Sequence, residues 1–235
     1  AFPRPDNGSV SAFEFTHRYL PTGSVGGDFF SVSALSKTEA AVFICDVAGH
    51  GVRSALITAM IRALVEEVKP PPTNPGQFLT RVNSDLCSIL KNTGTPLLTT
   101  AICLVANWKT GKLWYANAGH PKPLHVRRGA GHVTALGEGQ EKRQPALGLF
   151  ENTRYQSSPI QIAPNDLIML FTDGLIDVEG PERTLYSQAK LLESVQRRLQ
   201  LPAPRLFDEL IEEVRAFSNG HGFLDDLCLV GMDVM

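Results

Sequence analysis

Residues 40–51 read AAVFICDVAGHG, and the predicted architecture is built around this stretch. Its opening, AAVFIC, is an unbroken apolar run, which is typical of a strand buried on both faces. The run ends at Asp46, and Gly49 and Gly51 then allow a tight turn. Over residues 52–68 the apolar side chains recur at helical spacing, at positions 52, 56, 59, 60, 63 and 64. The stretch therefore predicts a buried strand that leads through a glycine turn into a helix, with a carboxylate at the junction.

Strand and helix patterns continue on both sides of this stretch. Prolines at 70–72 and 75 end the first helix, and a second helix is predicted over residues 76–91. Two further helices are predicted near 186–199 and 204–218. Strands are predicted over residues 13–19, 29–35, 40–45, 99–106, 113–117, 154–162, 167–171 and 227–234. We interpret the polar, glycine-rich residues 127–144 as an exposed hairpin or flap.

The order of these elements indicates the fold class. Short turns join most consecutive strands, which favours antiparallel pairing. Helices that come in pairs, and not between every two strands, are typical of an α+β protein. We expect an α/β/β/α sandwich of two antiparallel sheets flanked by helix pairs. Residues 1–12 contain two prolines and are interpreted as the end of a linker from an upstream regulatory region, followed by a single domain over 13–235.

The composition is that of an ordinary soluble globular protein. Apolar residues make up 43% and charged residues 20% of the 235 residues, and the net charge is −2. Neither nucleic acid nor an anionic membrane is indicated by this balance, and no apolar run approaches the ~20 residues of a spanning helix. The cysteines at 45, 87, 103 and 228 show no CxxC spacing. We interpret them as buried free thiols in a reducing cytoplasm.

Aspartates recur where the predicted buried strands end. Asp28 follows two glycines, Asp46 follows the apolar run, and Asp173 precedes a glycine, while Asp225 and Asp226 open the final strand. One such aspartate is more often a turn former or a helix cap than a ligand. A buried carboxylate is costly, however, unless it is paired or binds a cation. If these side chains converge, their oxygens select Mg²⁺ or Mn²⁺, and two such ions can activate water for phosphoryl hydrolysis.

Competing chemistries lack their motifs. The chain has no GxSxG elbow, no P-loop lysine and no HxH or HExxH spacing, so acyl transfer, nucleotide cradling and a zinc site are unsupported. Residues 25–30, VGGDFF, are similar to the GGDEF loop of diguanylate cyclases, but Phe29 stands where that loop needs an acid. His50, inside the glycine turn, is either a general acid for the leaving alcohol or a turn residue.

Six motifs in order resemble the metal-dependent PPM protein phosphatases, specifically the bacterial RsbU/SpoIIE branch. They are RYLP with VGGDFF, DVAGHG, ANAGHP, PALGL, TDGL and DDL, and they span nearly the whole chain. The resemblance implies two Mn²⁺ or Mg²⁺ ions at the edge of the sandwich. Carried over by position, Asp46 bridges both ions and the backbone carbonyl of Val47 binds one. Asp28, Asp173 and Asp225 complete the implied protein ligands.

The resemblance also implies a reaction and partners. The reaction is hydrolysis of phosphoserine or phosphothreonine by a metal-activated water, without a phosphoenzyme. The implied substrate is a phosphorylated anti-sigma-factor antagonist, a small STAS-domain protein of bacterial signalling. The predicted helices over 52–68 and 76–91 match the family's regulatory pair, which couples an upstream sensor domain or dimerisation to assembly of the metal site. The alternative function is a phosphatase-like binding module that sequesters a partner without turnover. Arg18 and Arg53 are candidates for phosphate binding.

Overall fold

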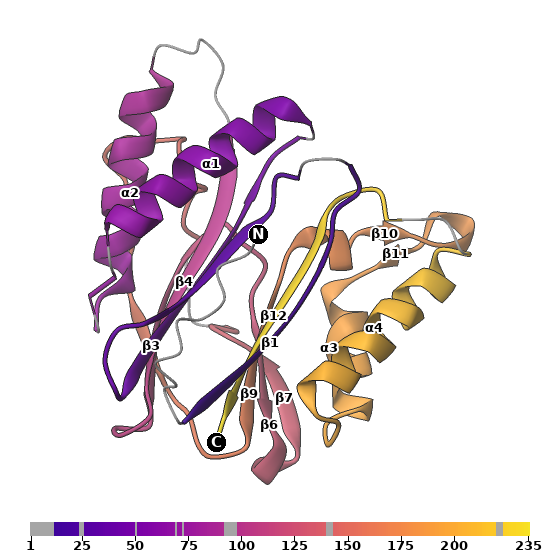
Figure 1. The fold of residues 1–235 in the computed structure, drawn as a ribbon. Helices are drawn as coiled ribbons and strands as arrows, with labels where there is room; N and C mark the ends of the chain where they lie inside the picture. Colours follow the sequence, from indigo (N-terminus) through magenta and orange to yellow (C-terminus); the bar gives the residue numbers. More distant parts are fainter. Residues whose placement is uncertain are drawn as a thin grey trace. The chain divides into compact units, whose positions relative to one another are not determined.

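The computed structural model describes residues 12–23, 26–49, 51–68, 70–71, 73–91, 98–139, 143–219 and 223–235. Within these ranges the chain forms two five-stranded antiparallel sheets and four α-helices (Figure 1). It divides into two compact units, and each unit contains one of these sheets with one helix pair. The predicted class, α+β with two antiparallel sheets flanked by helix pairs, is confirmed. The predicted linker end falls almost entirely on residues 1–11, which lie outside the described ranges.

The first unit comprises Ala1–Ala12, Val25–His120 and Gln140–Ile162. Its strands are β2 (Phe29–Ala34), β3 (Glu39–Val47), β4 (Thr99–Asn107), β5 (Lys112–Ala118) and β8 (Ser158–Gln161), paired in the order β2-β3-β4-β5-β8. Helices α1 (Val52–Glu67) and α2 (Pro75–Leu90) lie against this sheet (Figure 1). All of its strand pairs are antiparallel, as the short turns predict.

The strand β3 runs further than the apolar run AAVFIC. Its ladder continues through Asp46 and Val47, which pair with Thr100 and Thr99 of β4. Asp46 therefore lies inside the strand and does not follow it, which corrects the predicted end. Cys45 and Val47 join the core beneath α1 and α2, and because side chains alternate along a strand, Asp46 lies on the face opposite the helices.

The buried face of α1 differs from the predicted one. Val52, Leu56 and Met60 of the predicted apolar stripe are 72%, 57% and 39% exposed. The side chains that pack toward the sheet are instead Ser54, Ile57, Ile61 and Val65. Both stripes are largely apolar and both recur at helical spacing, so the period identifies the helix but not the side that faces β3.

Hydrogen bonds from two side chains of α2 tie the helix to residues 148–155. Asn83 is fully buried, its Nδ2 donates to the Phe150 carbonyl at 2.9 Å, and its Oδ1 accepts from Gly148 N at 2.9 Å. Tyr155 N donates to Thr80 Oγ1 at 3.0 Å. Since the backbone near residue 155 is bonded to α2 and not to β5, β8 begins only at Ser158, later than the predicted 154.

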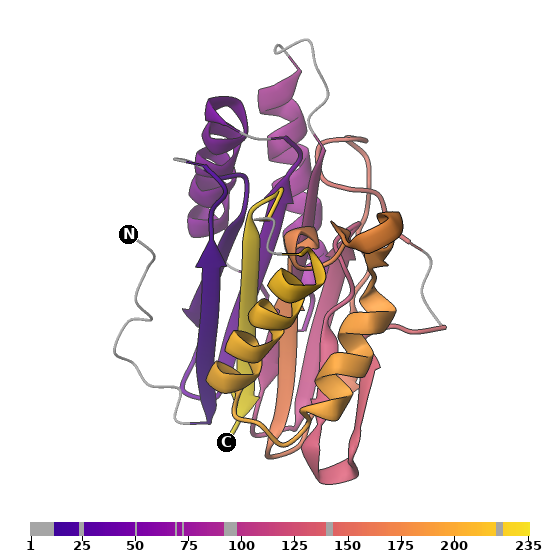
Figure 2. The same ribbon diagram turned by 90° about the vertical axis from the view of Figure 1, so that its right-hand side faces the viewer.

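The second unit comprises Phe13–Ser24, Pro121–Gly139 and Ala163–Met235. Its sheet has the order β1-β12-β9-β6-β7, from β1 (Phe13–Leu20), β12 (Leu227–Val234), β9 (Asp166–Phe171), β6 (Leu124–Arg127) and β7 (His132–Ala135). Figure 2 shows α3 (Gln188–Arg197) and α4 (Ala203–Phe217) lying across one face of it. A small ribbon of β10 (Val178–Glu179) and β11 (Leu185–Tyr186) was not predicted, nor were the 3-10 helices Arg128–Ala130, Asp173–Leu175 and Pro181–Arg183.

Residues 127–144 were predicted to form an exposed hairpin or flap; a hairpin is observed, but it is not fully exposed. Its described first half belongs to the β6–β7 hairpin, which extends the second sheet because β6 pairs with β9. Arg128 is only 13% exposed along its side chain, and its Nη1 donates to Asp233 Oδ1 at 2.8 Å. The charge that made this segment look solvated is neutralised by a residue near the other end of the unit's sequence. Residues 140–142 lie outside the described ranges.

Two further expectations concern the side chains and the membrane. All four cysteines are buried and their thiols are free, as expected, while the reducing cytoplasm stays a prediction. Among the described residues, no helix combines the length and the apolar character that crossing a membrane requires.

Candidate metal centre

The glycine turn before β2 brings Asp28 to the end of β3. The Gly27 carbonyl accepts hydrogen bonds from Val47 N at 3.3 Å and from Thr58 Oγ1 at 2.9 Å. A Cβ on Gly27 would lie 2.6 Å from the Val47 carbonyl oxygen and 3.6 Å from Asp46 Oδ1. Glycine is therefore required here for close approach, and the turn gathers three predicted ligands of the first unit: Asp28, Asp46 and the Val47 carbonyl.

The two carboxylates act on a common neighbour. Burial is the main reason why the pKa of the Cys45 thiol is raised well above its ordinary value, and the charges of Asp28 and Asp46 raise it further. Asp28 itself is only 7% exposed. Two carboxylates held close to one buried thiol create a local excess of negative charge, which a bound cation would relieve.

The turn that follows Asp46 has the predicted glycine geometry. Gly49 and Gly51 have φ angles of 95° and 90°, values that side-chain-bearing residues rarely adopt. Gly51 then caps α1 without a side-chain hydrogen bond. His50 lies outside the described residues, so both of its predicted roles, general acid and turn residue, stay predictions.

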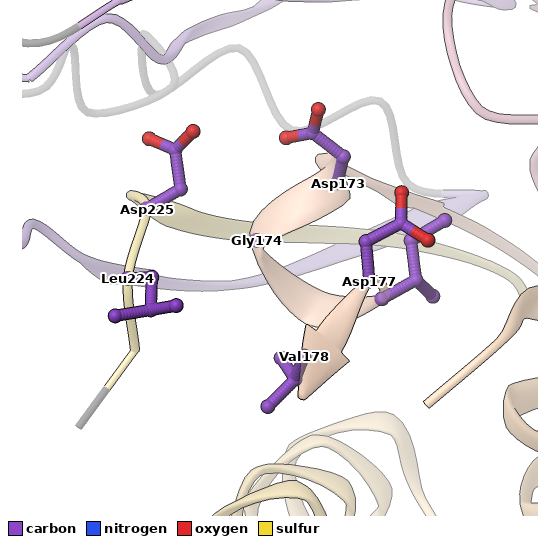
Figure 3. A pocket seen from close by; sticks show the side chains of 7 residues that line it. Asp173, Gly174, Asp177, Val178, Leu224 and Asp225 are labelled. Atoms are coloured by element: carbon purple, nitrogen blue, oxygen red, sulfur yellow. The ribbon is translucent and has the colours of Figure 1, made fainter. Parts of the chain in front are cut away.

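In the second unit, Asp173 and Asp225 line one cavity. Asp173 follows β9, Asp225 precedes β12, and the cavity of about 240 Å³ also has Asp177 in its lining. Figure 3 shows the Asp173 and Asp225 carboxylates pointing the same way from neighbouring segments. A Cβ on Gly174 would overlap the carbonyl oxygen of Asp226. A glycine after Asp173 thus permits the close contact that brings the two aspartates together.

Asp225 and its neighbour Asp226 differ in burial and in the contacts of their side chains. Asp226 is 5% exposed, and its Oδ1 accepts from Thr22 N at 2.8 Å and from Thr22 Oγ1 at 3.1 Å. Its carboxylate thereby anchors the segment after β1. Asp225 is exposed and faces the cavity, which supports its choice as the ligand of the pair.

The cavity has the electrostatics of a cation site. Burial raises the pKa of Asp173, and the negative charges of Asp225 and Asp177 raise it further. No lysine or arginine is among the side chains that line this cavity. Hard oxygen donors without a cationic partner fit Mg²⁺ or Mn²⁺ and do not fit softer metals. The residues present therefore match the chemistry of the implied ions.

Each unit holds only part of the predicted ligand set. Across the described portion of the chain, no three His, Cys, Asp or Glu side chains are grouped so that they could hold a metal ion by themselves. Asp28, Asp46 and the Val47 carbonyl are together in the first unit, and Asp173 and Asp225 are together in the second.

Sequence reasoning left two features out of the site. Asp177, four residues after Asp173, lines the same cavity with a φ of 59°, and a second carboxylate so soon after a strand end was the available signal. His120 is 5% exposed and its Nδ1 lies 2.8 Å from Thr100 Oγ1. Nothing in the spacing of these two residues in the sequence predicts that contact.

The two candidate phosphate-binding arginines differ in their surroundings. Arg18 donates through Nε and Nη2 to the two carboxylate oxygens of Asp208 on α4, at 2.7 and 3.1 Å. Its guanidinium is thus engaged by a helix and not by the aspartates of the site. Arg53 is exposed in the first turn of α1, directly after the glycine turn, and remains a candidate.

Comparisons with known proteins agree with the fold and with the motifs. The family model for Stage II sporulation protein E (SpoIIE) matches residues 36–235. Phosphoserine phosphatase RsbP of Bacillus subtilis (strain 168) is 25% identical over 218 residues, which cover 92% of this chain and 51% of RsbP. The chain thus spans about half the length of this curated relative.

Two solved structures share the fold. The SiaA-PP2C domain of Pseudomonas aeruginosa has a TM-score of 0.80 at 19% identity, covering 94% of this chain and 86% of that one. The catalytic domain of the serine/threonine phosphatase PstP, solved in complex with two manganese ions, has a TM-score of 0.67 at 17% identity, covering 95% of this chain and 99% of that one. With a family model that matches most of its length, the chain belongs to the SpoIIE family of PP2C-type phosphatase domains.

Proposed function

We propose that this chain is a metal-dependent protein serine/threonine phosphatase that hydrolyses phosphoserine or phosphothreonine. The observation that carries the proposal is the pair of glycine-built oxygen clusters. In one, Gly27 packs against the Val47 carbonyl beside Asp46, and in the other, Gly174 packs beneath Asp225 and Asp226. Each cluster consists of hard oxygen donors. Within the first, Asp28 and Asp46 both act on Cys45, and within the second, Asp225 acts on Asp173.

The proposed ligands of two Mn²⁺ or Mg²⁺ ions are Asp28, Asp46, the Val47 carbonyl, Asp173 and Asp225. Such ions, when bound, lower the pKa of a coordinated water and neutralise the charge of phosphoryl oxygens. The contribution of the chain is to hold the donors in place, since each cluster is fixed by backbone contacts at a glycine. The manganese ions in the structure of PstP support the choice of metal. His50, next to the first cluster in sequence, is the candidate general acid.

The proposed substrate is a phosphorylated STAS-domain antagonist of an anti-sigma factor. The support is the similarity to RsbP, which is named a phosphoserine phosphatase. Dephosphorylation of the antagonist would let it capture the anti-sigma factor and release sigma, as in a bacterial stress response. The four free thiols suit a cytoplasmic setting for this reaction.

We propose a single domain over 13–235 under the control of an upstream sensor domain, with α1 and α2 as the regulatory pair and a homodimer as a further partner. Val52, Leu56 and Met60 support this, because they form an exposed apolar stripe along α1. Contiguous exposed apolar patches mark interaction sites when they are large enough. Under this proposal the isolated domain binds metal weakly, and full activity that is insensitive to the native upstream region would contradict it.

The first test is hydrolysis of a generic phosphomonoester during titration with Mn²⁺. Activity that rises with Mn²⁺ and is lost in Asp46→Asn supports the proposal. Glu212→Gln is the matched control, because it removes a carboxylate that is 70% exposed on α4. An Asp46→Asn variant with wild-type activity would refute the proposed site. Tight capture of a phosphorylated partner without hydrolysis at saturating Mn²⁺ would favour the binding module.

A further inference from the structure

His120 is a buried histidine held rigidly at the end of β5. Its backbone N donates to Asn117 Oδ1 at 2.7 Å, and its carbonyl accepts from Asn117 Nδ2 at 2.9 Å. Gly119, with a φ of 75°, forms a bridge to Ala101 of β4. These contacts fix the backbone on both sides of His120, so the direction of its ring is set by the turn.

The ring of His120 is aimed at Thr100, and Thr100 is paired with Asp46. His120 Nδ1 lies 2.8 Å from Thr100 Oγ1. Thr100 and Asp46 are directly opposite in the antiparallel ladder of β3 and β4. Directly opposed residues have their Cβ atoms about 4.5–5.5 Å apart on the same face of a sheet, which is within hydrogen-bonding reach of a hydroxyl and a carboxylate. Thr100 thus lies between His120, which follows β5, and its ladder partner Asp46 of β3.

We propose that His120 and Thr100 are positioning residues that orient the Asp46 carboxylate through a hydrogen-bonded relay. In this relay His120 Nδ1–H donates to Thr100 Oγ1, and the Thr100 hydroxyl donates to Asp46. The inference rests on the proposed function for its consequence, since Asp46 is the carboxylate proposed to bridge both ions. Neither residue contacts the substrate, because both act through Asp46.

The direction of the relay follows from the charge at its end. A hydroxyl has one proton, so Thr100 can donate either to the imidazole or to the carboxylate. A hydrogen bond to an ionised acceptor is about twice as strong as one between neutral groups. The hydroxyl proton therefore goes to Asp46, and His120 must supply the proton of the Nδ1–Oγ1 contact. The relay thus requires the Nδ1–H tautomer of a neutral His120.

The first test reads that tautomer directly and needs no metal. Histidine-selective ¹⁵N NMR of the metal-free protein, well above the ordinary histidine pKa, is expected to show His120 as the Nδ1–H tautomer. In Asp46→Ala the hydroxyl loses its charged acceptor and turns to the ring, so His120 is expected to switch to Nε2–H. An Nε2–H tautomer in the wild type, or no switch in Asp46→Ala, would overturn the relay.

The second test measures what the relay does for metal binding. Calorimetric titration with Mn²⁺ is expected to show affinity reduced about 10-fold or more in Thr100→Val and in His120→Leu, the range found when partners of metal ligands are removed. Thr100→Ser keeps the hydroxyl, and His120→Asn keeps an N–H at the position of Nδ1, so both are expected to stay near wild type. The double variant Thr100→Val/His120→Leu is expected to lose no more than either single variant.

The outcomes separate the relay from the phosphatase proposal. Wild-type Mn²⁺ affinity in Thr100→Val, or losses that multiply in the double variant, would refute the relay while leaving the phosphatase intact. A wild type that binds no Mn²⁺, but whose His120 switches tautomer in Asp46→Ala, would refute the proposed metal site and uphold the relay.

Discussion

Gly27 lies so close to the carbonyl oxygen of Val47 that a Cβ in its place would be 2.6 Å from that oxygen. The atom in the way belongs to the backbone of β3, where Val47 is paired with Thr99 of β4 and cannot move without disturbing that ladder. Only glycine fits at position 27 of the VGGDFF motif, because any Cβ there would contact the Val47 carbonyl of the first oxygen cluster too closely.

Gly27→Ala is expected to lose phosphatase activity and Mn²⁺ binding and to lower the free energy of unfolding by about 1–3 kcal/mol, the usual cost of overpacking. Urea unfolding and a Mn²⁺ titration measure the two effects. The matched control is Gly129→Ala, because a Cβ there would meet nothing within 4 Å. A Gly27→Ala protein that matches the Gly129→Ala control in both measurements would show that the contact is unimportant.

Asp225→Asn and Asp226→Asn are expected to have opposite effects although the residues are adjacent. Asp225→Asn removes a proposed ligand from an exposed position, so activity is lost and stability is kept. Asp226→Asn weakens the bonds from Thr22, so stability falls by about 1–3 kcal/mol, the range for hydrogen bonds to charged groups, while activity at saturating Mn²⁺ is kept. Unfolding curves and activity of both variants check this, and the reverse pattern would move the ligand to Asp226.

The stability of the second unit is expected to fall in mild acid because of His125. Its Nδ1 accepts from Arg127 Nε at 3.2 Å and its Nε2 donates to Asp166 at 2.8 Å, so both ring nitrogens are satisfied in the neutral form. Burial lowers the pKa of His125, and the attraction of Asp166 only partly opposes this. The unfolded chain therefore binds the proton first as the pH falls below about 6.5.

That stabilisation is present above the unfolded pKa and is lost as the pH falls toward the lower folded pKa. Urea unfolding at several pH values is expected to show a shallower decline in His125→Gln than in the wild type. His17→Gln, which changes an exposed histidine of β1 that does not contribute to the pKa shift of His125, serves as the control. Identical pH profiles for the wild type and His125→Gln would contradict the assignment.

Leu56 and Ile57 are neighbours on α1 with opposite environments, at 57% and 5% exposed. Ile57→Ala is expected to cost about 2–5 kcal/mol, as for other buried aliphatic truncations, while Leu56→Ser leaves the unfolding midpoint nearly unchanged. In the protein with its native upstream region, Leu56→Ser is expected to alter the regulation of activity. Equal stability losses in the two variants would show that the exposed stripe is part of the core.

The helices and the long strands are predictable because the spacing of apolar residues along the chain indicates each of them directly. The last strand was predicted over 227–234 and is observed over those residues, and the predicted helix bounds agree with the structure within two residues. The β6–β7 hairpin was predicted only as an exposed hairpin or flap over 127–144, because Arg128 looks solvated until Asp233 is seen beside it. Pairing between distant residues is invisible to a pattern read along the chain.

In the candidate site too, features that lie close together in the sequence were predicted, and contacts between distant residues were not. Asp28, Asp46, Asp173 and Asp225 stand out in the sequence because glycines or buried strands flank them. The contact of His120 with Thr100 does not, because strand pairing brings the two residues together from 20 positions apart. The buried face of α1 was mispredicted for a related reason, since which of two apolar stripes is covered depends on the sheet.

Because Asp46 lies inside the β3 ladder, strand pairing preorganises its backbone. Its neighbours Cys45 and Val47 are paired with Phe29 and Thr99, so the backbone at Asp46 is ordered before any ligand arrives. Ordering a flexible segment consumes part of the free energy of binding, and Asp46 avoids that loss. Its backbone amide is expected to exchange with solvent as slowly as the amides of its neighbours in β3 and β4. The proposed ligand Asp225 precedes β12 and lacks this ordering by strand pairing.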